Sequence, residues 1–227
     1  MVLLGTEPVP PAENEGRKRR VGLAGGAAAV VVLVLIVKGA LGSFGGHSYE
    51  FLATQGGDPV TWNHCQAIRY QVNPKGAPAD WREIVDATVK DIEDASGFVF
   101  ADSGTTVKTQ LIGTGIYPGN QWEPVLIVWS DRYQDQSLDG GVIGRGGGGT
   151  IDVNGVRRYV VGKVSLDSSE KDSFETRMVL EHELGHVLGL GHTSDPDQLM
   201  YAGYHGQRGL GDGDIAGLKR LHDVPCD

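Results

Sequence analysis

The chain is poor in cysteine and in basic residues. Two of its 227 residues are cysteines, Cys65 and Cys226, and 20 lysines and arginines stand against 29 aspartates and glutamates, which gives a net charge of −9. Nucleic acid and anionic lipid headgroups are poor partners for so acidic a chain. The two cysteines lack the spacing of a metal-ligand pair, and we expect them to form one disulfide in an oxidising compartment.

Charge is also missing from one stretch near the N-terminus. Residues 21–37 are uncharged, the basic cluster 17–20 precedes them and Lys38 ends them. Such a run spans about 25 Å as a helix, at the short end for crossing a membrane. With the basic cluster held inside, we expect a disordered cytoplasmic tail over 1–20, a transmembrane signal anchor over 21–44 and an exported remainder. The alternative is a signal peptide that is cleaved to give a secreted protein.

The stretch from His182 to His192 carries the strongest chemical signal. It reads His-Glu-Leu-Gly-His-Val-Leu-Gly-Leu-Gly-His. On a helix, His182 and His186 project from the same face, so both imidazoles can bind one ion. Gly189 can adopt the left-handed conformation that ends a helix, and the chain can then bring back His192 as a third ligand. Three histidines leave one position of a zinc ion open, which is typical of a catalytic site rather than a structural one.

Glu183 is the expected general base. It follows the first histidine directly, and its carboxylate can reach a water on the ion without being a ligand. A core helix with incidental histidines is the alternative, but a buried helix rarely carries three imidazoles and two acids so close together. The motif therefore predicts hydrolysis by a water that zinc activates.

The residues after the motif make the pattern more specific. Asp195-Pro196 can turn the chain, and Met200 lies eight residues after the last histidine. With these residues, the run 182–201 resembles the metzincins and, among them, the matrixins, the matrix-metalloproteinase-like family. The resemblance implies that Met200 forms a supporting turn beneath the zinc and is not a ligand.

The same resemblance implies where a peptide substrate would bind. A strand edge at Val142 and Ile143 would take an extended peptide as an additional strand, and Tyr204 would line the pocket beside the zinc. A mobile glycine loop is the alternative for the first segment, because 146–149 is all glycine. Neither cysteine lies in the propeptide motif that keeps many matrixins latent, so we expect no cysteine-based latency.

Further metal sites find little support. Matrixins of animal tissues carry a second, structural zinc held by histidines and an aspartate, but residues 130–165 contain no histidine, so we expect no such site. Asp131, Asp135 and Asp139 could bind calcium through a loop. Their spacing lacks the rest of an EF-hand pattern, and solvated acids are the better interpretation.

Hydrophobic periodicity predicts an α+β domain. We expect strands at 68–72, 107–111, 125–129, 150–153, 156–159 and 160–166, and helices at 80–96, from about 172 onward, and at 212–222. Asn154-Gly155 predicts a two-residue hairpin turn. Combined with the resemblance, this gives a metzincin-like domain over 62–227. Its twisted, mainly parallel five-stranded sheet would pack on two long helices, with a small C-terminal helical subdomain. A linker over 45–61 would join it to the one transmembrane helix.

The predicted protein is thus a membrane-anchored zinc endopeptidase that acts on peptides or proteins outside the cytoplasm. A secreted form of the same enzyme is one alternative. The other is a non-catalytic domain that retains the fold and holds peptides in its cleft, although the intact Glu183 argues against it. Nothing in the sequence indicates an oligomeric state.

Overall fold

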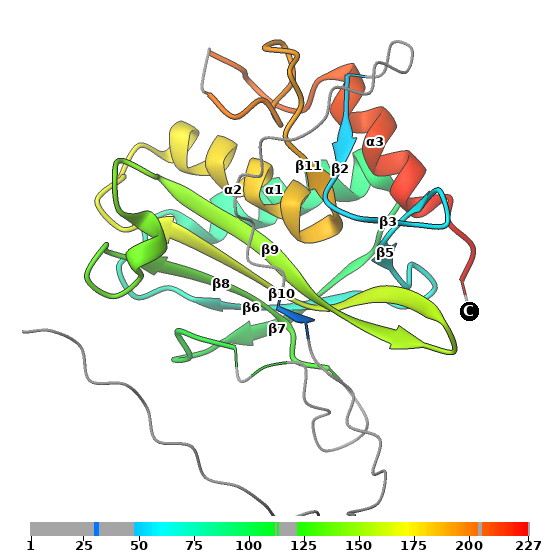
Figure 1. The fold of residues 1–227 in the computed structure, drawn as a ribbon. Coiled ribbons are helices and arrows are strands. Elements are labelled where there is room, and N and C mark those ends of the chain that lie inside the picture. Colours follow the sequence, from blue (N-terminus) through cyan, green and yellow to red (C-terminus); the bar gives the residue numbers. More distant parts are fainter. Residues whose placement is uncertain (1–29, 32–47, 112, 114–121, 204–205, 227) are drawn as a thin grey trace, which may run out of the picture.

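The computed structural model describes residues 30–31, 48–111, 113, 122–203 and 206–226 (Figure 1). Three helices lie on one side of a twisted sheet. In chain order the elements are β1 (Val30–Val31), β2 (Glu50–Phe51), β3 (Thr54–Gln55), β4 (Asp58–Pro59), β5 (Thr61–Trp62), β6 (Ile68–Asn73), α1 (Trp81–Ser96), β7 (Phe100–Thr105), β8 (Val125–Ser130), η1 (Gln136–Leu138), β9 (Gly144–Val153), β10 (Val156–Asp167), α2 (Ser173–Leu188), β11 (Leu190–Gly191) and α3 (Asp212–His222).

Five longer strands form the main sheet in the order β9-β10-β8-β6-β7. The last four pair in parallel, whereas β9 runs antiparallel to β10. Two short strands extend the sheet, β1 beside β9 and β5 beside β10. The predicted mainly parallel five-stranded sheet is therefore confirmed, with β9 as its antiparallel strand.

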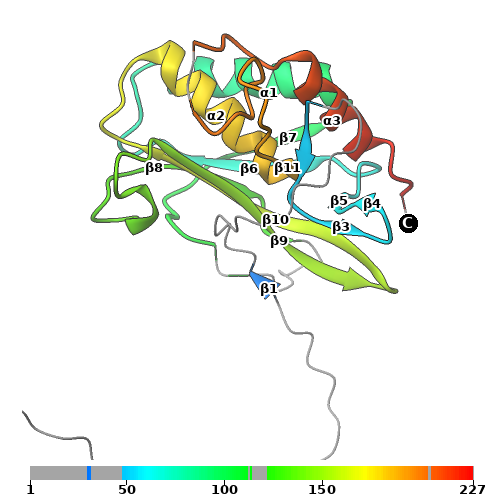
Figure 2. The same cartoon turned by 45° about the horizontal axis from the view of Figure 1, so that its top comes forward.

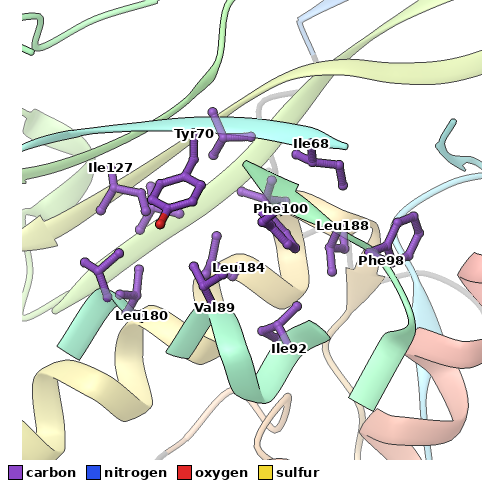
Figure 3. Packing of buried hydrophobic residues seen from close by; sticks show 14 of the residues in the cluster. Ile68, Tyr70, Val89, Ile92, Phe98, Phe100, Ile127, Leu180, Leu184 and Leu188 are labelled. Carbon is purple, nitrogen blue, oxygen red and sulfur yellow. The ribbon is translucent and has the colours of Figure 1, made fainter. Parts of the chain in front are cut away.

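The helices cover one face of the sheet (Figure 2). Apolar residues three and four positions apart form a stripe on α1 and another on α2, and both stripes face the strands. Gly97 ends α1 at a φ of 85°. Figure 3 shows the resulting core, in which helix and strand side chains interdigitate. Its members include Ile68, Tyr70, Val89, Ile92, Phe98, Phe100, Ile127, Leu180, Leu184 and Leu188.

The prediction of strands from short apolar runs was right for β8 and wrong for the segment before it. All six residues of β8 are buried, as the unbroken run from Val125 predicts for a central strand. The strand expected at 107–111 was wrong: the chain forms β7 at Phe100–Thr105 instead. Phe98 and Phe100 are buried in the core, whereas Val107 is 94% exposed. Burial of the two aromatic rings fixes where this strand lies, and a single valine cannot compete with it.

The turn and disulfide predictions are confirmed. Asn154 and Gly155 both have positive φ, 50° and 84°, which is the geometry that joins β9 to β10 in a tight hairpin. Cys65 and Cys226 form a disulfide across 161 positions, with their Cα atoms 6.1 Å apart. The bridge ties the start of the domain to the residues after α3.

Asp80 links the two long helices instead of capping one of them. It precedes α1, but its side chain makes no capping hydrogen bond to that helix. Its Oδ2 accepts a hydrogen bond from the hydroxyl of Ser173, the first residue of α2, at 2.6 Å. The N-terminal ends of α1 and α2 are thereby joined.

The segment before Trp62 carries more structure than a linker. Within 45–61, the four two-residue strands β2 to β5 begin, the first of them at residue 50, and Val60 and Thr61 are buried. Of the expected span 21–44, the described residues are Val30 and Val31, which pair with Thr150 and Gly149 as β1. Within the described part of the chain, no helix is both long and apolar enough to cross a membrane.

Candidate metal centre

Helix α2 carries the first two histidines of the motif. It begins after Asp172, whose carboxylate accepts the backbone N–H of Glu175 at 2.9 Å. It ends at Gly189, where φ is 120°. A Cβ on that residue would lie 3.0 Å from the carbonyl oxygen of Val60, so the turn needs glycine for space as well as for conformation.

Strand β11 then leads to the third histidine. Leu190 and Gly191 pair antiparallel with Phe51 and Glu50 of β2, and the carbonyl of Gly189 accepts the backbone N–H of Leu52 at 2.9 Å. The N-terminal strand β2 therefore fixes the chain immediately before His192. This long-range pairing is what holds the third imidazole opposite α2.

The ring nitrogens of the three histidines converge. The Nδ1 of His182 donates to the carbonyl of Leu199 at 2.7 Å, and the Nδ1 of His186 donates to the carbonyl of Leu190 at 2.8 Å. A carbonyl can only accept, so both rings carry their proton on Nδ1 and keep the Nε2 lone pair for a metal. The Nε2 of His192 lies 3.2 Å from that of His182 and 3.1 Å from that of His186.

These spacings fit zinc. Bonds of about 2.0–2.1 Å at tetrahedral angles place two ligand nitrogens about 3.3 Å apart. The predicted ligands His182, His186 and His192 are also one of the groups of side chains whose donor atoms all lie within 4.8 Å of one another. Three imidazoles fill three tetrahedral positions and leave the fourth open, as at a catalytic site.

Burial keeps the imidazoles in the form that binds metal. It lowers the pKa of His182 to about 4, even though the carbonyl of Leu199 acts in the opposite direction. It lowers the pKa of His186 to about 3, helped by the two neighbouring histidines. The pKa of His192 is also lowered, first by burial and then by the charge of Arg145. All three rings are therefore neutral at physiological pH, before any ion is bound.

Glu183 lies between α2 and β9, 7% exposed. Glycines on β9 permit this close approach. A Cβ at Gly144 would lie 2.9 Å from Oε1 of Glu183, and a Cβ at Gly146 would lie 2.1 Å from its carbonyl oxygen. The glycines 146–149 therefore lie in a strand and not in a mobile loop, and their lack of side chains lets β9 pack directly on α2. The strand expected at Val142 and Ile143 was misplaced, because β9 begins only at Gly144.

The surroundings of the Glu183 carboxyl shift its pKa. Burial raises its pKa to about 8, against the positive charge of Arg145 and a hydrogen bond from the backbone of Gly146. The same carboxyl beside a divalent cation would titrate lower, because a positive charge favours the ionised form.

Met200 packs beneath the motif helix. It is 1% exposed, and a Cβ at Gly185 would lie 2.6 Å from its Sδ. Its carbonyl accepts the backbone N–H of Thr193 at 3.1 Å. The methionine turn therefore contacts α2 between the two histidine positions and holds the residue after His192. The supporting role of Met200 beneath a zinc ion stays a prediction.

Asp214 anchors the methionine turn, and sequence reasoning missed it. Its carboxylate, fully buried, accepts the backbone N–H groups of Leu199 at 2.6 Å, Met200 at 3.3 Å and Gly211 at 2.9 Å. Gln198 adds two more bonds by accepting the N–H groups at the start of α3. In the sequence, an acid in the first turn of a helix indicates only a favourable interaction with the helix dipole. No local signal therefore showed that Asp214 binds the methionine turn.

The remaining predicted residues are placed as follows. Val142 and Ile143 immediately precede β9, and the carbonyl of Ile143 accepts the backbone N–H of Asp167 at 2.9 Å. Ile143 is 44% exposed. Tyr204 lies outside the described residues. The pocket role of these three residues stays a prediction.

The aspartates considered for calcium are used in other ways. Asp131 accepts backbone N–H groups of the following loop, and Asp139 accepts that of Gly140. Asp135 bonds to Lys163 and Ser165 on β10, at 3.1 and 2.8 Å. The structure gives no calcium arrangement for these three side chains among the described residues.

A second cluster of ligand-type side chains lies at the disulfide. The Nε2 of His64 is 3.2 Å from Sγ of Cys226. Both sulfurs are bonded to each other, so the cluster offers no thiolate to a metal while the bridge is intact.

Comparison with known proteins finds one family and two individual proteins that parts of this chain resemble. The family described as Matrixin matches residues 129–223, which include the three histidines, Glu183 and Met200. Matrilysin of Rattus norvegicus is 48% identical over 48 residues, covering 19% of this chain and 18% of that protein. The crystal structure of archaemetzincin from Methanopyrus kandleri aligns with a TM-score of 0.45 and 16% identity, covering 68% of this chain and 95% of that one.

Proposed function

We propose that the protein is a zinc endopeptidase, from the premise that residues 129–223 match the matrixin family. The observation that carries the proposal is the convergence of three imidazoles, in which the Nε2 atoms of His182 and His186 lie 3.2 and 3.1 Å from that of His192. The carboxyl of Glu183 follows on the same helix. A zinc ion held there supplies a Lewis acid that polarises a carbonyl and lowers the pKa of water from 15.7 to about 7.

Glu183 performs the proton transfers. Its side chain is one residue from a ligand, is held by the backbone of Gly146 and is almost fully buried. It takes a proton from the attacking water and delivers it to the nitrogen of the leaving amine as the peptide bond breaks. No covalent intermediate with the protein is needed, because water is the nucleophile.

The substrate is an extended peptide. Val142 and Ile143 lead into β9, and the outer side of β9 beside Glu183 offers backbone groups for strand addition. We assign the substrate backbone to this edge and a pocket side chain to Tyr204.

Two substitutions test the chemistry. In the full-length chain, purified in detergent, Glu183→Gln should keep about one zinc per chain and lose nearly all cleavage of a mixed peptide library, because the base is not a ligand. His186→Ala should lose the zinc itself. Glu175→Gln, an exposed acid on the first turn of the same helix, is the matched control. Near-normal cleavage by Glu183→Gln would exclude this mechanism, and chelator-insensitive cleavage would exclude zinc.

We also propose that residues 21–44 anchor the chain in a membrane with the domain outside. The basic cluster 17–20 before the apolar run supports this orientation, and the disulfide suits an oxidising compartment. Pairing of Val30 and Val31 with β9 is an alternative arrangement of the same residues, since a strand on the domain cannot also lie in lipid. Secretion after cleavage is the competing route.

Protection of an N-terminal tag distinguishes these arrangements. In intact cells, protease added outside should degrade the domain and spare a tag at residue 1, and alkaline extraction should leave the chain with the membranes. A soluble form that starts near Ser43 would favour signal cleavage. An accessible tag would contradict the orientation.

A further inference from the structure

Arg145 is a charged side chain in an otherwise bare part of β9. From Gly144 to Gly149 the strand reads Gly-Arg-Gly-Gly-Gly-Gly. The α-hydrogens of Gly144 and Gly146 face α2, where a Cβ would touch Glu183. Side chains alternate along a strand, so Arg145 projects on the opposite face, and it is exposed.

The outer edge of this part of β9 is open. β1 pairs with Gly149 and Thr150, and β10 lies on the other side of β9. Among the described residues, no strand pairs with the outer edge of 144–148. A peptide added there would run beside Arg145 with no other side chain of the strand near it.

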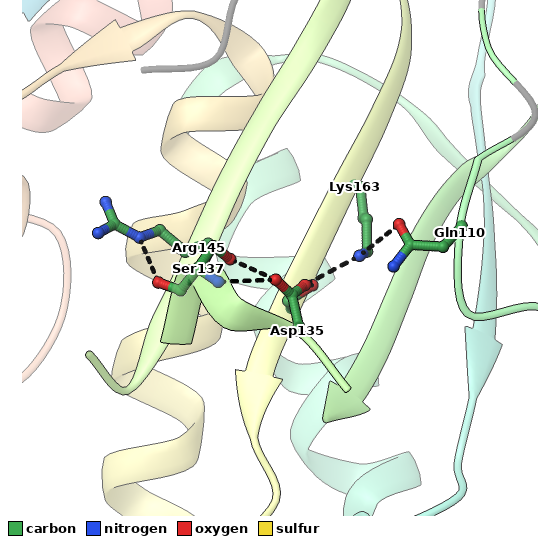
Figure 4. Close-up of polar contacts among 6 residues, drawn as sticks. Gln110, Asp135, Ser137, Arg145 and Lys163 are labelled. Atoms are coloured by element: carbon green, nitrogen blue, oxygen red, sulfur yellow. Dashed lines mark hydrogen bonds and ion pairs between the residues drawn. The ribbon is translucent and has the colours of Figure 1, made fainter. Parts of the chain in front are cut away.

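A polar network fixes the arginine. Its Nε donates to the carbonyl of Ser137 at 3.1 Å. The hydroxyl of Ser137 donates to Asp135 at 2.6 Å, and Asp135 is held in turn by Lys163 and Ser165 of β10. Figure 4 shows Arg145 turned away from Lys163, with its guanidinium beyond β9.

The guanidinium charge is left available. Asp135 is paired with Lys163, and Arg145 makes no ion pair with any described residue. The charge still reaches the metal centre, where it acts on both His192 and Glu183. A fixed, unpaired cation next to an open strand edge is suited to meet a carboxylate on whatever strand is added.

We propose that Arg145 is a specificity residue that selects a carboxylate-bearing side chain in the peptide, at the position directly across from it on β9. The inference rests on the proposed peptide binding at this edge. Cross-strand neighbours on one face lie about 4.5–5.5 Å apart, within reach of an arginine, and an opposite-charge pair there should favour aspartate or glutamate by about two- to five-fold. The chain's net charge of −9 disfavours acidic peptides in general, so a preference confined to one position identifies the local effect.

Binding to a chain that cannot cleave tests this directly. The full-length Glu183→Gln variant, loaded with zinc, would be titrated with fluorescent neutral decapeptides. One position at a time would carry Asp, Asn or Lys. The peptides would be acetylated and amidated, and a parallel set with a free C-terminus separates a side-chain carboxylate from a terminal one.

At one position, Asp should bind about two- to five-fold more tightly than Asn. That preference should vanish with Arg145→Gln and turn into a preference for Lys with Arg145→Glu. Arg157→Gln, which changes an exposed arginine at the far end of the hairpin, should leave it unchanged.

Equal affinities at every position would overturn the proposal. So would a preference that survives Arg145→Gln, a preference for the free C-terminus alone, or a lack of binding. The proposed peptidase activity is judged separately: a wild-type chain that never cleaves, while its variant shows the positional preference, contradicts the activity and supports the role of Arg145. Conversely, cleavage by the wild-type chain without any charge preference in binding supports the peptidase activity and contradicts the role of Arg145.

Discussion

Asp135→Asn should destabilise the domain in a pH-dependent way. The side chain of Asp135 is 14% exposed and that of Lys163 18%. Burial acts to raise the pKa of Asp135, but hydrogen bonds from Ser137, Ser165 and Lys163 outweigh it and bring the pKa to about 2. A carboxyl whose ordinary pKa is 3.8 and which is held that low contributes about 2 kcal/mol of stability at neutral pH.

The direction of the pH dependence follows from the lowered pKa. Because the folded state holds the proton less tightly than the unfolded state, the contribution is complete above about pH 5 and is lost as the pH falls towards 2. Urea unfolding, followed by tryptophan fluorescence, should show a free-energy gap between wild type and Asp135→Asn of about 2 kcal/mol at pH 7. The gap should persist at about pH 5 and narrow below about pH 4.

Asp86→Asn is the matched control. Asp86 is an exposed acid on α1 that makes no hydrogen bond or ion pair among the described residues, so its removal changes the net charge equally without breaking a network. A gap no larger than that of the control at pH 7 would refute the reasoning. A gap that stays constant down to the acid limit of folding would also refute it, because then the carboxylate charge is not what stabilises the loop.

Two further predictions concern packing and covalent structure. Gly146→Ala should destabilise the domain by about 1–3 kcal/mol, because its Cβ would lie 2.1 Å from the carbonyl oxygen of Glu183. Gly147→Ala is the control and should be nearly neutral, because its Cβ would have no atom within 4 Å. Thermal melting measures the contrast, and equal melting temperatures of the two variants would contradict the packing of β9 on α2. Unreduced, denatured protein should show no free thiol on alkylation, and reduction of Cys65–Cys226 should lower the stability by about 2–5 kcal/mol, so two reactive thiols per chain, or no loss on reduction, would refute the bridge.

The metal ligands were predictable because their placement is local. His182 and His186 meet through helix periodicity alone, and Gly189 marks the point where the helix ends. The long strands and helices followed in the same way from runs of apolar residues. Asn154-Gly155 fixed the hairpin through its own backbone preference.

The parts that the sequence did not reveal depend on distant partners. Strands β2 to β5 have two residues each, too few to show any periodicity, and they exist because they pair with distant or neighbouring strands. Asp214 and Asp135 look like surface acids until the groups around them are known. The strand predicted at 107–111 was misplaced, because the two phenylalanines that reach the core at β7 lie in a segment without alternating apolar and polar residues.

The pairing of β2 with β11 also sets the order in which the protein can become competent. Residues 50–51 leave the ribosome long before residues 190–191, which they must hold. Closing so long a loop is slow compared with forming a helix, so the third imidazole is fixed late. A growing chain therefore lacks a complete ligand set until nearly all of it has been made. This delay keeps the proposed hydrolytic activity from arising while most of the chain is still being synthesised.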